Sequence, residues 1–160
     1  MSISTKIEMS FNRISRLEDL DELAEILFPG NKNHQRTFLA IFIELKYARG
    51  KFLSDLSFIT RKYDISRRTL ERVRAKMRRM GIIDHISRFN QKHGYREGWV
   101  LSSRFSRALH ALADKMQIFK TKDDSKQRDK DLFVLGMIRK SEPKIERQSE
   151  NSESADYNDI

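Results

Sequence analysis

The chain has 160 residues, with 32 Lys or Arg against 23 Asp or Glu, so its formal net charge at pH 7 is +9. This length suits one domain with appended segments and a buried core. The absence of cysteine excludes disulfides, thiolate catalysis and cysteine-ligated zinc. No stretch approaches the roughly 18 apolar residues of a membrane span, and the N-terminal residues lack the apolar core of a signal peptide. We therefore expect a soluble, cytoplasmic protein.

The positive charge is concentrated in one block of the chain. Residues 1–29 carry a net charge of −3 and residues 30–60 carry +3. Residues 61–104 carry +9, whereas residues 105–160 are neutral. A local excess of this kind favours a polyanionic partner, and it predicts binding that weakens steeply with salt.

The first expected element is an amphipathic helix within residues 1–30. Ser15 and Glu18 have the spacing of a capping box, and leucines follow at helical spacing until Phe28-Pro29-Gly30. A second helix is expected over residues 34–48, ending before Gly50. Its inner stripe is Phe38, Ile41, Phe42 and Leu45, and it is widened by Leu39 and Ile43, which predicts deep burial of all six.

A short third helix is expected within residues 54–63, followed by a turn at residues 64–66 and a basic helix over residues 66–80. Ser66 is a natural N-cap, and Gly81 is a natural end. The apolar face of the basic helix consists of Leu70, Val73, Met77 and Met80. On a 100° wheel the opposite face consists of Arg68, Arg72, Ala75 and Arg79.

The period then changes to that of strands, over residues 82–88 and 98–101, with Trp99 and Leu101 facing the core together. We expect residues 89–97 to form a connecting loop that projects cationic side chains and little apolar bulk. This loop holds Lys92, His93, Gly94 and Arg96, and Arg88 lies at its base.

A C-terminal helix is expected over residues 103–120. Its apolar stripe has heptad-like spacing and consists of Phe105, Leu109, Leu112, Met116 and Phe119. The stripe could pack against the N-terminal helix of its own domain, or it could form a homodimer interface, which we favour. Within residues 121–160 we expect a charged linker over 121–131, an apolar segment over 132–138 that docks on the domain or binds another protein, and a disordered, mostly acidic tail.

This order of elements, from about Asn33 to Leu101, resembles the winged helix-turn-helix domain of DNA-binding proteins. The spacing from Ile59 to Ser66 resembles the helix-turn-helix core of many prokaryotic regulators, and residues 77–83 are similar to the exit of a recognition helix into the wing. Asp64 stands where such families often have Gly. The expected fold is therefore mainly α with a small β-hairpin: a winged helix-turn-helix over residues 31–102, flanked by an N-terminal and a C-terminal helix.

The resemblance implies that the basic helix enters a major groove and that the wing reaches the backbone or minor groove. Arg68 and Arg72 would contact guanine edges, and Ala75 would allow close approach. The remaining late or flanking cations would hold phosphates, although any single arginine could instead be a solvent-exposed partner in an i,i+4 pair. The complete expected contact set is Arg61, Lys62, Ser66, Arg67, Arg68, Glu71, Arg72, Ala75, Lys76, Arg78, Arg79, Arg88, Lys92 and Arg96.

The resulting functional hypothesis is sequence-specific binding of double-stranded DNA by a dimeric, nucleoid-associated transcription regulator. The alternatives are a plasmid or viral replication-initiation or partition protein, or a nonspecific chromatin or RNA binder. The histidines at 34, 85, 93 and 110 lack metal-ligand spacing, and no nucleophile has an evident base, so we expect no metal, no cofactor and no enzymatic activity.

Overall fold

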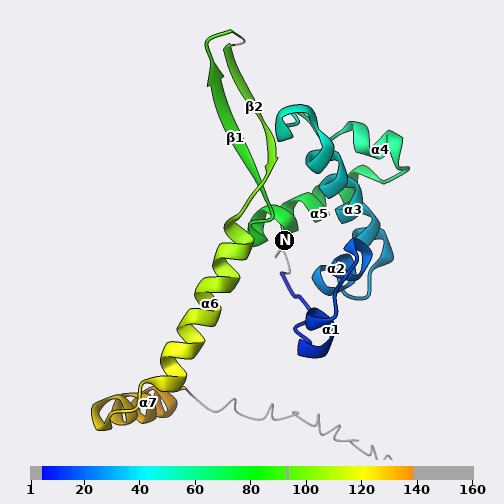
Figure 1. Ribbon diagram of the computed structural model, residues 1–160. Coiled ribbons are helices and arrows are strands. Elements are labelled where there is room, and N and C mark those ends of the chain that lie inside the picture. The colour runs from blue at the N-terminus through cyan, green and yellow to red at the C-terminus, as the bar shows by residue number, and fades with distance from the viewer. Residues whose placement is uncertain (1–4, 93, 139–160) are drawn as a thin grey trace, which may run out of the picture. The chain divides into compact units, whose positions relative to one another are not determined.

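The computed structural model describes residues 5–92 and 94–138. In this part of the chain there are seven α-helices and one two-stranded antiparallel sheet, which confirms the predicted mainly α fold with a small β-hairpin (Figure 1). The chain divides into two compact units, residues 1–116 and 117–160. None of the described helices has the length and apolar character needed to cross a membrane. The tail predicted over residues 139–160 lies outside the described residues.

The core of the first unit is built mainly on α3 (Lys32–Tyr47) and α5 (Arg67–Met80). Apolar residues recur every three or four positions in both helices, so each presents one continuous stripe to the other. The fully buried large side chains of this core include Phe28, Phe38, Ile41, Leu45, Leu56, Ile59, Val73, Met77 and Ile83.

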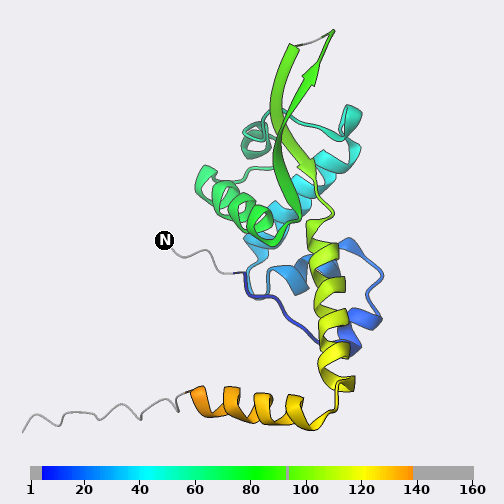
Figure 2. The same ribbon diagram turned by 90° about the vertical axis from the view of Figure 1, so that its left-hand side faces the viewer.

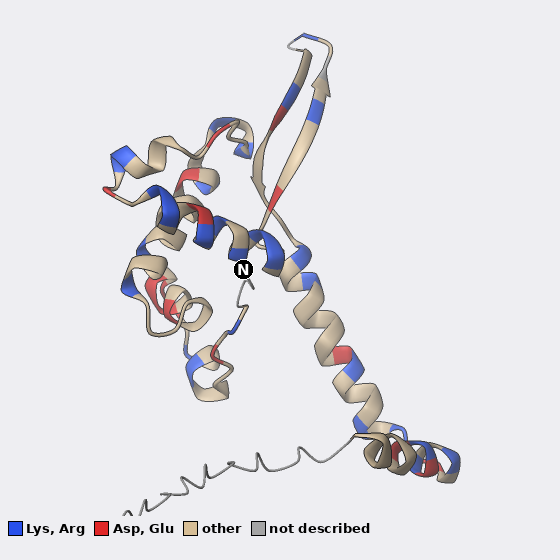
Figure 3. Ribbon diagram, turned by 180° about the vertical axis from the view of Figure 1, so that it is seen from behind, with Lys and Arg blue, Asp and Glu red and all other residues tan. Residues whose placement is uncertain are grey.

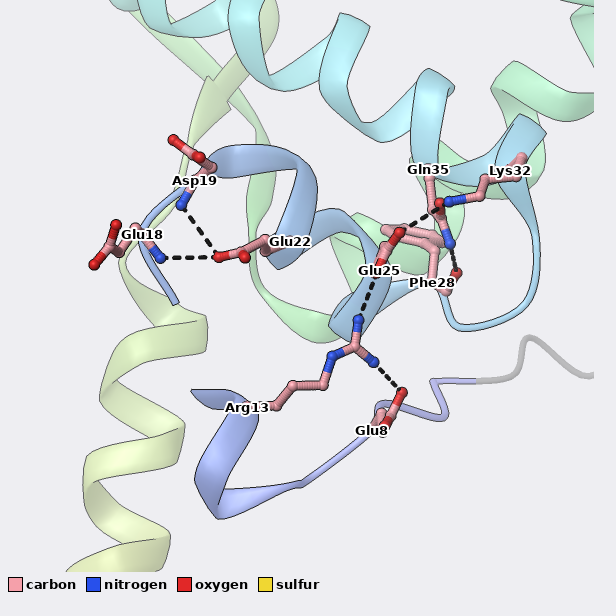
Figure 4. Close-up of polar contacts among 9 residues, drawn as sticks. All are labelled: Glu8, Arg13, Glu18, Asp19, Glu22, Glu25, Phe28, Lys32 and Gln35. Atoms are coloured by element: carbon pink, nitrogen blue, oxygen red, sulfur yellow. Dashed lines mark hydrogen bonds and ion pairs between the residues drawn. The ribbon is translucent and has the colours of Figure 1, made fainter. Parts of the chain in front are cut away.

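The N-terminal region contains two short helices, α1 (Phe11–Ser15) and α2 (Leu20–Leu27), instead of the single helix expected. The capping interaction lies one turn later than predicted: the Glu22 carboxylate accepts the backbone N–H groups of Glu18, at 3.0 Å, and Asp19, at 3.4 Å (Figure 4). Ser15 instead donates to the Asn12 carbonyl at the end of α1. The predicted Ser15–Glu18 capping box is therefore wrong, because the same pattern recurs at Asp19 and Glu22.

Ion pairs of Arg13 join α1 to α2 and to the segment before α1. The Arg13 guanidinium bridges the carboxylates of Glu8, at 2.7 Å, and Glu25, at 2.5 Å (Figure 4). Glu25 also accepts from Lys32 at 2.9 Å, which links α2 to the start of α3. The hydrogen bond from Lys32 is the main cause that lowers the pKa of Glu25.

The buried face of α3 differs from the predicted one. Ile43 is 37% exposed, and Leu39 and Phe42 are only half-buried, so the prediction of deep burial is wrong for these three residues. Ile43 lies about 200° around the helix from Ile41, which is the centre of the buried face. Polar Gln35 and Thr37 are buried instead. Burial is possible because Gln35 donates to the Phe28 carbonyl at 2.9 Å and Thr37 to the Asn33 carbonyl at 2.7 Å.

The turn between α4 (Phe58–Lys62) and α5 has the expected form. Asp64 adopts a φ of 51°, in the left-handed region, at the position often filled by Gly. The Ser66 hydroxyl caps α5 by accepting the Thr69 N–H at 3.1 Å. Gly81, with a φ of 82°, ends the helix, as predicted.

The hairpin is longer than predicted. Strand β1 (Ile83–Asn90) pairs with β2 (Gly94–Leu101) from Ile83↔Leu101 through Asn90↔Gly94, so most of the expected loop is strand. Phe89 and Tyr95, which the sequence pattern predicts to lie in the loop, pair with each other, in keeping with the strand preference of aromatic residues. Figures 1 and 2 show the hairpin projecting away from the helices, which it meets only at its base. Trp99 and Leu101 both pack against the core, as predicted.

A third segment joins the hairpin edge, which the sequence did not indicate. Leu53, between α3 and α4, exchanges two backbone hydrogen bonds with Trp99, at 3.0 and 2.7 Å. The close approach requires Gly98, because a Cβ there would lie 2.5 Å from the Leu53 carbonyl oxygen. This bridge ties the base of the hairpin to the segment that leads into α4.

The expected C-terminal helix is present as α6 (Arg104–Thr121), which begins in the first unit and ends in the second. The second unit also contains α7 (Ser125–Met137). Most of the predicted charged linker is therefore helical. Asp124 caps α7 by accepting the Gln127 N–H at 2.7 Å, and Gln127 pairs with Asp131 one turn later at 2.8 Å.

Candidate nucleic-acid interface

The two faces of α5 differ sharply in their surroundings. Leu70, Val73 and Met77 are buried in the core, whereas Arg68 and Arg72 are exposed on the other side. Arg67, Arg78 and Arg79 are exposed as well, so basic residues occur along the whole length of the helix (Figure 3). Burial of the apolar stripe thus fixes the rotation of α5 and directs its arginines to solvent.

One acidic residue interrupts this cationic surface. The Arg67 Nε donates to Glu71 Oε1 at 3.0 Å, one helical turn away. Both side chains are well exposed, and exposed pairs of this kind contribute about 0.5 kcal/mol or less. Arg67 can therefore exchange Glu71 for a phosphate at small cost.

The Lys76 side chain is hydrogen-bonded within the protein instead of being exposed on the cationic face. Its ammonium donates to the carbonyls of Leu27, at 2.6 Å, and Lys6, at 2.9 Å. It also lies 4.3 Å from the centre of the Phe28 ring. Burial lowers the pKa of Lys76. The group that the sequence placed among the phosphate contacts thus joins α5 to the end of α2 and to the N-terminal segment.

Lys62 is also engaged within the protein. Its ammonium pairs with the Glu44 carboxylate, which accepts the Tyr63 hydroxyl at 2.5 Å. The hydrogen bond from Lys62, followed by that from Tyr63, lowers the pKa of Glu44. Arg61, its neighbour in α4, is exposed. Of the two cations predicted at the end of α4, Lys62 therefore has an acidic partner, whereas Arg61 faces solvent.

A cationic groove lies between the second half of α5 and the base of the hairpin, with a volume of about 710 Å³. Arg74, Arg78 and Arg79 line it, and the Arg74 guanidinium lies 5.1 Å from the centre of the Trp99 ring. The other lining residues are Ala75, Asp84, His85, Trp99 and Arg104.

The groove has one acidic group, Asp84, which is paired with Arg104. The Arg104 Nε donates to one Asp84 oxygen at 3.2 Å, and its Nη2 donates to the other and to the Arg78 carbonyl. This hydrogen bonding lowers the pKa of Asp84. The pair leaves Arg74, Arg78 and Arg79 as excess positive charge. The sequence analysis did not select Arg74 or Arg104, because only the packing of the hairpin on α5 brings them to the same groove.

The hairpin brings together two of the three predicted wing cations. Arg88 and Arg96 are paired in register, so both lie on the same face of the sheet. The Arg88 guanidinium lies 5.4 Å from the centre of the Phe52 ring, and Arg96 lines a hollow beside Phe52 and Leu53. Lys92 lies in the exposed turn at the tip.

The apolar stripe of α6 is only partly covered. Phe105 packs against the core and Leu109 is half-buried. Leu112 and Met116 are 63% and 68% exposed, so these residues are not buried against the N-terminal helices of their own unit. Phe119, in the second unit, is exposed too. Among the residues that the structure describes, no group of three or more potential ligands is arranged for a metal ion.

Comparison of the chain with family models, curated proteins and solved structures finds no match.

Proposed function

We propose that the protein binds double-stranded DNA sequence-specifically, with α5 as the recognition helix and the β1–β2 hairpin as the wing. The observation that carries this proposal is the opposition of the two faces of α5: the buried Leu70, Val73 and Met77 against the exposed Arg68 and Arg72. A helix held in this way can present arginine pairs to base edges in a major groove without unfolding any of its own core.

Within this proposal the cations have separate roles. Arg68 and Arg72, in the first half of α5, contact bases, for which bidentate hydrogen bonds to guanine are the best fit. Arg78 and Arg79, with Arg74 in the groove, hold phosphates of the strand that passes between helix and wing. Lys76 is not among the proposed DNA contacts, because both of its described acceptors are backbone carbonyls of its own chain.

We also propose that the protein is a homodimer in which the exposed part of the α6 stripe pairs with that of a second copy. The exposure of Leu112 and Met116 supports this arrangement, and a two-fold dimer would present two recognition helices to an inverted repeat. Sedimentation of the wild type and of Leu112→Asp tests it. We expect a dimer for the wild type and a monomer for the variant, and monomers in both would refute the dimer.

Selection of bound fragments from random and genomic DNA tests the DNA-binding proposal. We expect one enriched motif, and an Arg72→Ala variant that binds it about 10-fold or more weakly while binding random DNA almost as well as the wild type. Arg16→Ala, which removes an exposed arginine outside α5 and the hairpin, is the charge-matched control. Equal losses on both DNAs would refute base contact by Arg72, and retention of no duplex at all would refute the proposal.

The positions of the genomic fragments identify the cellular role. We propose regulation of transcription at the nucleoid, for which the enriched sites should lie upstream of reading frames. A single cluster of repeated sites would instead indicate replication initiation or partition.

A further inference from the structure

The tip of the wing carries two aromatic side chains that are largely exposed to solvent. Phe89 and Tyr95 are directly opposite each other in the register, and they are 77% and 62% exposed. Single exposed apolar residues are common on protein surfaces. Two aromatic residues paired at the end of a projecting hairpin form a local apolar surface, which indicates a partner with a flat, apolar face.

The two rings are held differently. The Tyr95 hydroxyl donates to Glu97 Oε1 at 2.8 Å and lies 2.7 Å from the Ser87 hydroxyl oxygen. These contacts fix the Tyr95 ring along the strand, on the face that it shares with Ser87 and Glu97. Phe89 has no polar group to anchor it, and it is the more exposed of the two. Tyr95 can thus serve as a fixed support, beside which Phe89 projects.

The charges around the tip favour an anionic partner. Arg88 and Arg96 lie one register position nearer the base, on the opposite face of the hairpin from the two rings. Lys92 lies in the turn, and Glu97 is the one acidic residue in the sequence of residues 87–97. Glu97 is engaged by the Tyr95 hydroxyl. A hairpin end that carries aromatic rings on one face, and cations on the other face and in its turn, fits nucleic acid, which offers flat bases bordered by phosphates.

The length of the hairpin agrees with this partner. Eight residues in each strand, at about 3.3 Å per residue, extend about 26 Å from the end of α5. In B-DNA, which repeats about every 34 Å, successive major and minor grooves are separated by about half that distance. A wing that starts beside a helix in the major groove can therefore bring its tip to the adjacent minor groove.

We propose that Phe89, supported by Tyr95, inserts between two base pairs of the minor groove next to the site of α5 and unstacks them. This inference rests on the proposed DNA binding and adds a local distortion of the duplex to it. Apolar side chains that enter a base step in this way kink DNA toward the major groove, and pyrimidine–purine steps yield most easily. The wing would thus favour a deformable step at a fixed distance from the bases that α5 contacts.

The test uses the full chain and the duplex obtained by selection, with 2-aminopurine placed at successive positions beside the α5 site. Saturating wild-type protein should raise the fluorescence at one step, because an unstacked 2-aminopurine is no longer quenched by its neighbours. Phe89→Ala should abolish this rise and weaken binding about 10-fold. Phe11→Ala is the matched control, because Phe11 is an 83% exposed phenylalanine in α1, and it should change neither.

The exposure of Phe89 makes a folding defect in Phe89→Ala unexpected, and thermal unfolding checks this. Phe89→Leu is a second variant, which keeps apolar bulk and should retain part of the fluorescence rise. Wild-type protein that binds the duplex without unstacking any position would overturn this inference alone. Binding to no duplex would overturn it together with the proposed function. Loss of self-association by Phe89→Ala without DNA would show that the tip packs on a second copy, and would overturn the inference too.

Discussion

Lys76 and Arg79 lie one turn apart on α5, and the structure predicts opposite results for their replacement by methionine. Lys76 donates to two backbone carbonyls of its own chain, whereas Arg79 is exposed beside the cationic groove. Methionine keeps an unbranched apolar stem in both cases and removes the charge and the donors. The pair therefore separates a structural cation from a proposed DNA contact.

The cost of Lys76→Met follows from the bonds that are lost. Hydrogen bonds that involve a charged group contribute about 1.5–3 kcal/mol each, and Lys76 makes two, at 2.6 and 2.9 Å. The burial that lowers the pKa of Lys76 offsets part of this, because it disfavours the ammonium form. We expect a net loss of about 2 kcal/mol in the free energy of unfolding. For a unit the size of residues 1–116, this loss of unfolding free energy corresponds to a decrease of about 8 °C in Tm.

The assay combines thermal unfolding with a salt titration of DNA binding for the two variants. Lys76→Met should lower Tm and leave unchanged the slope of log affinity against log salt concentration. Arg79→Met should change the free energy of unfolding by less than about 0.5 kcal/mol and lower the slope by about 0.9. An unchanged Tm together with a reduced slope for Lys76→Met would refute the structural role and restore Lys76 to the phosphate contacts.

Three further substitutions, one of them with a matched control, test the fold that positions the site. The pKa of Glu44 is lowered in the folded protein, so the stability that its charge contributes is complete above the ordinary pKa of 4.5 and is lost as the pH falls through the folded-state pKa. Glu44→Gln should therefore weaken the dependence of the free energy of unfolding on pH in the acid range. An unchanged dependence would contradict this. Gly98→Ala should cost about 1–3 kcal/mol, because its Cβ would meet the Leu53 carbonyl at 2.5 Å. Gly136→Ala, with nothing within 4 Å, is its control and should stabilise α7 by about 0.5–1 kcal/mol. Asp64→Gly should stabilise the turn by about 0.5 kcal/mol, since the φ of 51° suits Gly better than Asp, and a lower Tm would contradict that reasoning.

The best-predicted element is α5, because all its signals are local. Its N-cap, its apolar spacing and its terminal Gly81 lie within 16 residues, and each acts through the hydrogen bonds or the face of one helix. The turn before it was predictable for the same reason, since Asp64 tolerates the conformation that the turn requires. These local features are sufficient to predict which arginines of α5 are exposed, without any tertiary contact.

The hairpin shows where local signals were insufficient. Residues 89–97 contain Gly, Asn and several charges, which favoured a loop over strands. Pairing of Phe89 with Tyr95 extends the ladder, and the bridge between Leu53 and Trp99 adds a contact that comes from 46 residues away in the chain. The exposed aromatic tip exists only because of this extension.

The sequence by itself determined which residues of α5 are apolar and which are basic, and hence that one face would be buried and the other cationic, because helical periodicity is a property of the local chain. The tertiary structure decided which cations of α5, and of α4 before it, remain available for a partner. Lys76 meets the carbonyl of Leu27, 49 residues earlier, and Lys62 meets Glu44, 18 residues earlier. Hydrogen bonds between segments that are distant in the chain depend on how the helices pack, so the residue spacing within a single helix cannot predict them.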